Sequence, residues 1–282
     1  MRLERTKSIP YNSANIPPSV VQFCGNNKKQ NLLQPTDVNI QKALGTDNIN
    51  MLKKLYRIAK GQDADVYLFG GCVRDCIAGQ KIHDLDIMVN ADAISFSVLM
   101  KFLEPKTFHR LFLKPSVKRA VVYTPKLHID VKSVSSTGEK LPNGKVTKSA
   151  LYKRLTAHDY TINSMLIKLS ENKKGKFRLK FIDVLGGKKD LKSKRLVHIR
   201  PENFAHEPIN ALRGIRFIAK YNMKVEPETA KLIKNCFNGK VNKSKFYYYK
   251  VLREFVRIFK ATKNPLKSLK YIIKYNGYKA IF

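Results

Sequence analysis

Two apolar runs on either side of a glycine pair limit the folds open to residues 66–89. Val66–Phe69 is predicted to be a buried strand that ends at Gly70 and Gly71, and Asp84–Val89 is predicted to be a second strand. A short helix is expected between them. This order of strand, helix and strand indicates a domain in which helices pack against a sheet.

Polar and apolar residues alternate in the second strand. Successive side chains of a strand leave opposite faces, so Asp84 and Asp86 share one face and the apolar residues between them share the other. Two carboxylates this close repel each other unless a cation is present, and a glycine pair lets the backbone approach a phosphate group. The pattern therefore favours metal-assisted phosphoryl chemistry. A pair of solvated carboxylates on an edge strand is the alternative.

The remaining sequence divides into a mixed part and a helical part. Further strands are expected at 119–123 and 127–131, apolar runs at 161–169 and 179–184, helices at 40–59 and 93–102, and a loop at 135–149. Beyond Pro201 no strand is expected, and apolar residues recur at helical spacing in 208–221, 227–237, 245–260 and 265–275. We predict an α+β protein with a disordered leader (1–38), a mixed-sheet head domain (39–200) and an all-α neck domain (201–282).

The charge of the chain favours a polyanionic partner. Its 55 Lys and Arg residues outnumber 21 Asp and Glu residues, which gives a formal charge of +34. A solvated basic surface is the alternative interpretation. Basic residues and tyrosines alternate beyond residue 240, where Glu254 is the single acid, and this composition suits phosphates and stacked bases. RNA binding is therefore predicted for Lys243, Lys245, Lys250, Arg253 and Arg257.

Cysteine and hydropathy patterns favour a cytoplasmic protein. Four cysteines in 282 residues do not form a disulfide framework, and Cys72 and Cys76 lack a second ligand pair at zinc spacing. No apolar stretch approaches the roughly 20 residues that a membrane span needs. The basic N-terminus leaves organelle targeting open.

Four motifs follow one another along the chain. They are Gly-Gly-Cys-Val-Arg-Asp at 70–75 with Gly79, Asp84 and Asp86; Asp-Tyr-Thr-Ile-Asn-Ser-Met at 159–165; Asp-Val-Leu-Gly-Gly-Lys-Lys-Asp-Leu at 183–191; and Glu207-Pro208 with Leu212-Arg213, Arg216-Phe217 and Glu226-Pro227-Glu228-Thr229. Together they resemble the tRNA nucleotidyltransferase and poly(A) polymerase family (class II) of the polymerase β superfamily. The resemblance covers about residues 50–282.

The resemblance implies a nucleotidyltransferase that extends an RNA 3′ end without a template, as in tRNA CCA addition or poly(A) tailing. ATP is the expected substrate, with CTP as a second candidate, and two Mg²⁺ ions are the expected cofactors. Catalysis and metal binding are expected on Asp84, Asp86 and Asp130, with Asp130 orienting or deprotonating the terminal hydroxyl. Nucleotide binding is expected on Gly70, Gly71, Arg74, Asp75, Asp159, Asn163, Glu207, Asn210, Arg213 and Arg216. For Arg74 and Asp75 a structural salt bridge is an equal alternative.

Departures from the family pattern keep other functions open. Ala157-His158 replaces paired arginines, Arg154 replaces an aspartate, and 206–210 reads His-Glu-Pro-Ile-Asn where the family has Glu-Asp-x-x-Arg. One alternative is therefore a catalytically altered RNA-binding protein on the same scaffold. Another is transfer to a small-molecule or protein hydroxyl.

Overall fold

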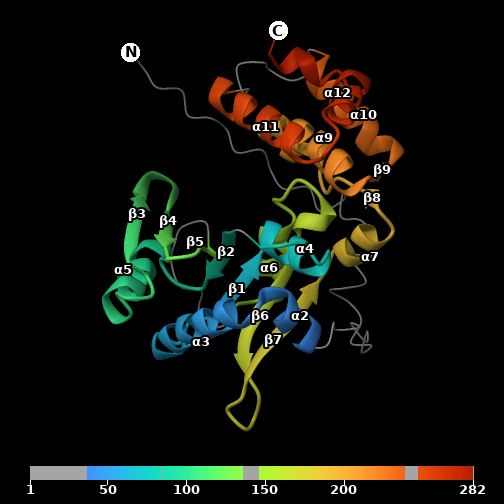
Figure 1. The fold of residues 1–282 in the computed structure, drawn as a ribbon. Coiled ribbons are helices and arrows are strands. Elements are labelled where there is room, and N and C mark those ends of the chain that lie inside the picture. The colour runs from blue at the N-terminus through green and yellow to red at the C-terminus, as the bar shows by residue number, and fades with distance from the viewer. Residues whose placement is uncertain (1–36, 83, 136–145, 239–246, 282) are drawn as a thin grey trace, which may run out of the picture. The chain divides into compact units, whose positions relative to one another are not determined.

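A mixed sheet forms the centre of the structure, a computed structural model that describes residues 37–82, 84–135, 146–238 and 247–281. All of these residues belong to one unit, 34–282. The sheet has the order β3-β4-β5-β2-β1-β6-β7 (Figure 1), with β2 parallel to β5 and the other neighbours antiparallel. The strands are β1 (Val66–Phe69), β2 (Asp84–Val89), β3 (Arg110–Lys114), β4 (Arg119–Tyr123), β5 (His128–Ser133), β6 (Met165–Glu171) and β7 (Phe177–Asp183).

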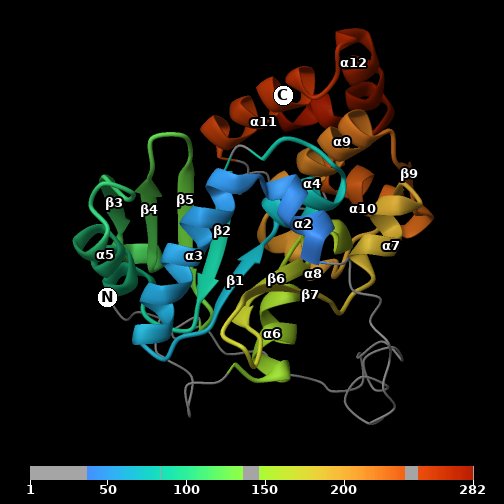
Figure 2. The same ribbon diagram turned by 60° about the horizontal axis from the view of Figure 1, so that its bottom comes forward.

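The two faces of the sheet pack against different elements. Leu85, Ile87 and Val89 are fully buried in a core shared with the helices α2 (Asp37–Leu44), α3 (Thr46–Gly61), α4 (Gly71–Ile77) and α5 (Ala93–Leu103). Each buried side chain of this size contributes about 1.5–3 kcal/mol. Figure 2 shows α2 and α3 in front of the central strands. On the opposite face a smaller cluster joins Tyr67 and Met88 to Leu155 of α6 (Lys148–Leu155), so the rest of that face is left for polar residues.

The second half of the chain is mainly helical. It contains α7 (Gly187–Lys192), α8 (Glu202–His206), α9 (Ile209–Tyr221), α10 (Pro227–Phe237), α11 (Tyr248–Lys260) and α12 (Pro265–Lys274). Three short 3₁₀ helices also occur: η2 (Pro115–Val117) before β4, η4 (Thr161–Asn163) before β6 and η6 (Gly277–Ala280) after α12. α10, α11 and α12 all pack against α9, whose apolar stripe is buried. α9 ends where Asn222 adopts a left-handed conformation, and α10 begins where the side chain of Glu226 accepts a hydrogen bond from Thr229. The described residues contain no helix long and apolar enough to cross a membrane.

The α+β class and the order of the main elements agree with the prediction, and the differences have local causes. The expected helix at 40–59 is two helices, because Gly45 between α2 and α3 has φ +77°. α2 also includes residues 37 and 38 of the expected leader, whose first 36 residues lie outside the described ranges. α6 begins inside the expected loop at 135–149.

β6 and β7 lie in segments that were predicted only as apolar runs, and three further strands were not predicted. β3 is an exposed edge strand without a clear apolar alternation, and its pairing with β4 defines it. β8 (Arg195–Leu196) and β9 (Lys224–Val225) have two residues each, too few for a sequence pattern, and they pair with each other. The expectation that no strand follows Pro201 was therefore wrong for β9. The boundary at 200/201 stays a prediction.

Candidate active site

One face of the sheet brings polar side chains of neighbouring strands together. In the parallel register of β2 and β5, Asp84 lies opposite His128 and Asp86 lies opposite Asp130. Alternate residues of a strand share a face, so Lys132 joins Asp130 on the same side. The three acids expected from the sequence thus lie on two adjacent strands beside the glycine pair.

The carboxylate of Asp86 lies against the turn that follows β1. A Cβ atom on Gly70 would lie 3.7 Å from Asp86 Oδ2, and one on Gly71 would lie 3.9 Å from it. Gly70 has φ +69°, a conformation that favours glycine. Within the described residues, the Asp86 carboxylate has no hydrogen-bond or ion-pair partner, and burial raises its pKa although Lys132 and other cations lie nearby. Such a carboxylate suits a bound cation.

The other two acids have protein partners. Asp84 Oδ1 lies 3.0 Å from Nδ1 of His128, and both side chains are about half exposed. Both carboxylate oxygens of Asp130 accept hydrogen bonds from Arg119. Like charges opposite each other across two strands destabilise a sheet, and this guanidinium offsets the charge of Asp130 beside Asp86.

The expected three-acid metal site is therefore not assembled. Across the described ranges, no three side chains of His, Cys, Asp or Glu are grouped so that they could hold a metal ion. Asp84 and Asp86 are carboxylates of β2 that line the cavity, and carboxylate oxygens are the ligands that Mg²⁺ prefers. The residues present thus fit a Mg²⁺ ion at Asp84 and Asp86, while both oxygens of Asp130 accept hydrogen bonds from Arg119.

Cations line much of the same cavity, whose volume is about 490 Å³. Gly71, Asp84 and Asp86 line it as well. Two helices form its cationic wall, with Arg213, Arg216 and Lys220 on α9 and Arg257 and Lys260 on α11, and Arg74 of α4 is a further cation. Acids and an excess of cations in one cavity suit a triphosphate with its metal ions.

Arg74 and Asp75 join α4 to α9. Arg74 is buried, and its Nε donates to Asp75 at 3.1 Å and to the hydroxyl of Tyr221 at 2.9 Å. Its guanidinium lies 4.8 Å from the ring centre of Phe217. Tyr221 also donates to Asp75. These contacts favour the structural alternative for both residues, although both line the cavity.

A second buried network holds Arg213 at the cavity. Asp159 accepts hydrogen bonds from Arg213 Nε and from Asn163 Nδ2, both at 2.7 Å. Burial opposes the charge of Asp159, but Arg213 and Asn163 more than compensate and lower its pKa. The structure thus gives Asp159 and Asn163 a positioning role behind Arg213, and neither lines the cavity.

Two expected nucleotide-binding residues lie elsewhere. Glu207 is exposed and pairs with Lys250 at 3.2 Å, and the amide of Asn210 donates to the carbonyl of Asn203 at 3.1 Å. Both lie where α8 passes into α9, and the carbonyl of Asn203 in α8 also accepts from the backbone N–H of Glu207. Neither lines the cavity, so the structure does not bring them to the nucleotide site that was expected.

The expected RNA-binding residues are partly described. Lys243 and Lys245 lie outside the described residues. Lys250, Arg253 and Arg257 lie on α11, which follows directly on the exposed tyrosine 247. Arg257 also lines the cavity, so the basic face of α11 reaches the site.

Sequence reasoning gave no role to several cations near the acids: Arg119, Lys132, Lys220 and Lys260. Alternation alone placed Lys132 on the face of Asp130. Burial lowers the pKa of Lys132 to about 8, with the nearby Asp86 acting against this change. Arg119 could be found only from the pairing of β4 with β5.

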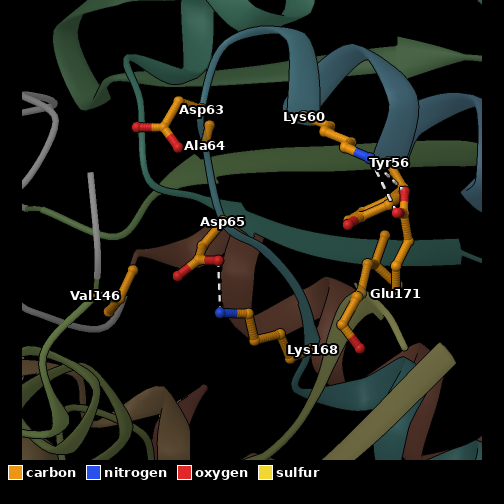
Figure 3. A pocket seen from close by; sticks show the side chains of 10 residues that line it. Tyr56, Lys60, Asp63, Ala64, Asp65, Val146, Lys168 and Glu171 are labelled. Carbon is orange, nitrogen blue, oxygen red and sulfur yellow. Dashed lines mark hydrogen bonds and ion pairs between the residues drawn. The ribbon is translucent and has the colours of Figure 1, made fainter. Parts of the chain in front are cut away.

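A second cavity, also of about 490 Å³, lies at the other end of β1. Figure 3 shows its charged side chains pairing with one another. Lys168 lies 2.5 Å from Asp65, and Lys60 lies 2.9 Å from Glu171. The charged groups of this cavity thus balance one another in pairs.

Known proteins share this fold and its motifs. Residues 66–197 match the family described as poly A polymerase head domain. The chain is 29% identical over 192 residues to an A-adding tRNA nucleotidyltransferase of Halalkalibacterium halodurans, covering 67% of this chain and 43% of the relative. It is 30% identical to poly(A) polymerase I of Salmonella typhi, covering 65% and 40%.

Solved structures agree with these matches. A CCA-adding enzyme in complex with CTP superposes with a TM-score of 0.73 at 27% identity, covering 88% of this chain and 56% of that chain. The Thermotoga maritima CCA-adding enzyme complexed with tRNA also gives 0.73, at 26% identity, covering 88% and 55%. Residues 66–197 are thus a head domain of the poly(A) polymerase type, and the chain belongs to the tRNA nucleotidyltransferase and poly(A) polymerase family. It spans about half the length of these relatives or less.

Proposed function

We propose that the chain is an RNA 3′-terminal nucleotidyltransferase that uses ATP, and CTP as a second substrate, without a template. One observation carries the proposal: Asp84 and Asp86, the second of which lies against a glycine turn, line the same cavity as the cations of α9 and α11. The family membership and relatives named as tRNA nucleotidyltransferases and poly(A) polymerases support it.

The acids and the cationic wall of the cavity would have separate roles. Asp84 and Asp86 would hold Mg²⁺, which when bound neutralises phosphate charge and makes the terminal hydroxyl of the RNA a better nucleophile. Arg216, Lys220 and Lys260 would hold the triphosphate by charge. Gly70 and Gly71 leave room for its approach because no Cβ atom fills the turn. The 3′ oxygen then attacks the α-phosphorus, and pyrophosphate leaves.

The RNA strand would enter along α11. Lys250, Arg253 and Arg257 provide charge, and the exposed Tyr247, Tyr248 and Tyr249 next to them offer aromatic faces for bases. We place the protein in the cytoplasm, because Cys72, Cys76 and Cys236 are free and buried.

The test is incorporation of labelled nucleotides by the purified chain with Mg²⁺. Each of the four NTPs is offered with a tRNA that lacks its CCA end and, separately, with an oligo(A) primer. Incorporation on tRNA identifies CCA or A addition, and processive extension of oligo(A) identifies poly(A) synthesis. RNA binding without incorporation on either primer would instead support the RNA-binding scaffold and overturn the proposal.

A further inference from the structure

Arg119 lies where a side chain of β4 reaches the acids of the neighbouring strands. In the β4–β5 register Val121 pairs with Asp130, and Arg119 is two residues away on the same face. Diagonal neighbours across two strands are within reach of a long side chain. Arg119 uses this reach to donate from Nε and Nη2 to the two carboxylate oxygens of Asp130.

The other two acids of this face are not held in this way. Asp86 has no hydrogen-bond or ion-pair partner in the described part of the chain, and Asp84 contacts only a half-exposed histidine there. A two-pronged arginine–carboxylate pair is among the strongest that side chains form. Asp130 is therefore the single member of the trio whose oxygens are both occupied by a cation of the protein.

Arg119 can exchange this partner for another. Its side chain is 36% exposed, whereas that of Asp130 is 10% exposed, so the guanidinium is the partner able to leave. Arg253 of α11 is close enough to disfavour the charge of Arg119. A phosphate group offers a guanidinium the same two-pronged geometry as a carboxylate.

We propose that Arg119 is a positioning residue that keeps Asp130 from a divalent cation until a phosphate of the substrate draws the guanidinium away. Asp84 and Asp86 hold a cation beforehand, and Asp130 joins them only after the exchange. Completion of the metal site is thereby coupled to the arrival of nucleotide or RNA. This inference rests on the proposed function, since it assigns a phosphate-bearing substrate to the same site.

The test measures binding of Mn²⁺ alone, by electron paramagnetic resonance of the free ion, to the full chain without nucleotide or RNA. Arg119→Ala frees Asp130, so the variant is expected to bind Mn²⁺ about tenfold more tightly than wild type. Arg110→Ala, which removes an exposed arginine from the neighbouring strand β3, is the control for general loss of positive charge and should bind like wild type. Adding Asp130→Asn to Arg119→Ala should cancel the gain.

Arg119→Lys provides the second variant, because it keeps the charge but loses the two-pronged geometry and should give an intermediate gain. Unchanged or weaker Mn²⁺ binding in folded Arg119→Ala would overturn the proposal, as would an equal gain in Arg110→Ala. The readout needs no catalysis. If the purified chain incorporates no nucleotide, the proposed function is overturned. The Mn²⁺ measurement still decides the role of Arg119 in that case.

Discussion

The two ends of β1 open into cavities of the same volume, about 490 Å³, that differ in how their charges are arranged. At the end that precedes Val66, lysines and acids pair side by side, as Lys60 does with Glu171. At the end that follows Phe69, Asp84 and Asp86 share the cavity with the cations of α9 and α11, of which Lys220 pairs with Asp75 at 3.3 Å. Size therefore does not distinguish the two cavities, and the balance of charge does: six Lys and Arg residues line the second cavity with three acids, whereas two Lys residues line the first with three acids.

The difference has a physical basis. Charges that balance one another leave little field for a ligand, whereas an excess of cations attracts a ligand that carries phosphates. The first cavity is lined by α3, β6 and the residues just before β1. The second owes its excess of cations to α9 and α11.

The largest expected effect is on nucleotide incorporation, and it should occur in a variant of one cavity and not of the other. Asp86→Asn removes the carboxylate charge beside the glycine turn and should lower nucleotide incorporation by roughly 10²–10³-fold or more, with RNA affinity kept. Glu171→Gln makes the same change in the other cavity and should incorporate like wild type. Steady-state incorporation assays measure both. Equal losses in the two variants would remove the distinction.

The next effect concerns stability in acid, because excess cations at the active cavity also act on a neighbouring histidine. Burial lowers the pKa of His158 to about 4, with Lys132 and Arg213 adding to the effect and Asp159 opposing it. The unfolded chain therefore binds this proton at higher pH than the folded chain does, so stability is full above about pH 6.5 and falls towards pH 4. The loss should be about 2–3 kcal/mol.

Urea unfolding at pH 7 and pH 4.5 measures this loss. His158→Gln should flatten the pH dependence, while His109→Gln, which changes an exposed histidine of the head, should leave it intact. The same slope in wild type and His158→Gln would show that the buried His158 does not determine acid sensitivity.

The smallest effect tests the cationic wall. Lys260→Ala removes one charge from the active cavity and should raise the KM for ATP by about tenfold, with a smaller change in kcat, because the lysine binds the triphosphate in both ground and transition states. Lys60→Ala is the matched variant in the other cavity, and its KM should stay that of wild type. A rise in KM in both variants would show that the net charge of the protein, and not the position of the lysine, determines ATP binding.

Much of the head was predictable from local pattern. The alternation of Asp84–Ile87 predicted which side chains are buried, since a half-buried strand has a period of two, whereas Met88 on the face of the acids is buried as well. The glycine pair predicted the close approach of a phosphate, which stays a prediction, and the structure places Asp86 Oδ2 beside it. Helices α9, α10 and α12 begin and end close to where apolar spacing and proline residues indicated.

The roles of single residues were less predictable. Glu207 and Asn210 occupy motif positions, but the start of α9 directs them to Lys250 and Asn203. Arg74 carries a motif charge, but Tyr221, 147 positions away in sequence, accepts one of its hydrogen bonds. Such partners come from elements that meet only in the folded chain.

The sequence by itself determined the chemistry on offer: acids two residues apart on one strand, a glycine turn before them, and a basic helical second half. Only the tertiary structure decided how that chemistry is arranged. It places Asp130 opposite Asp86, pairs Asp130 with Arg119, and brings α9 and α11 to the cavity as its cationic wall. The reason is that strand periodicity is local, whereas strand register and helix packing depend on contacts between residues far apart in the chain.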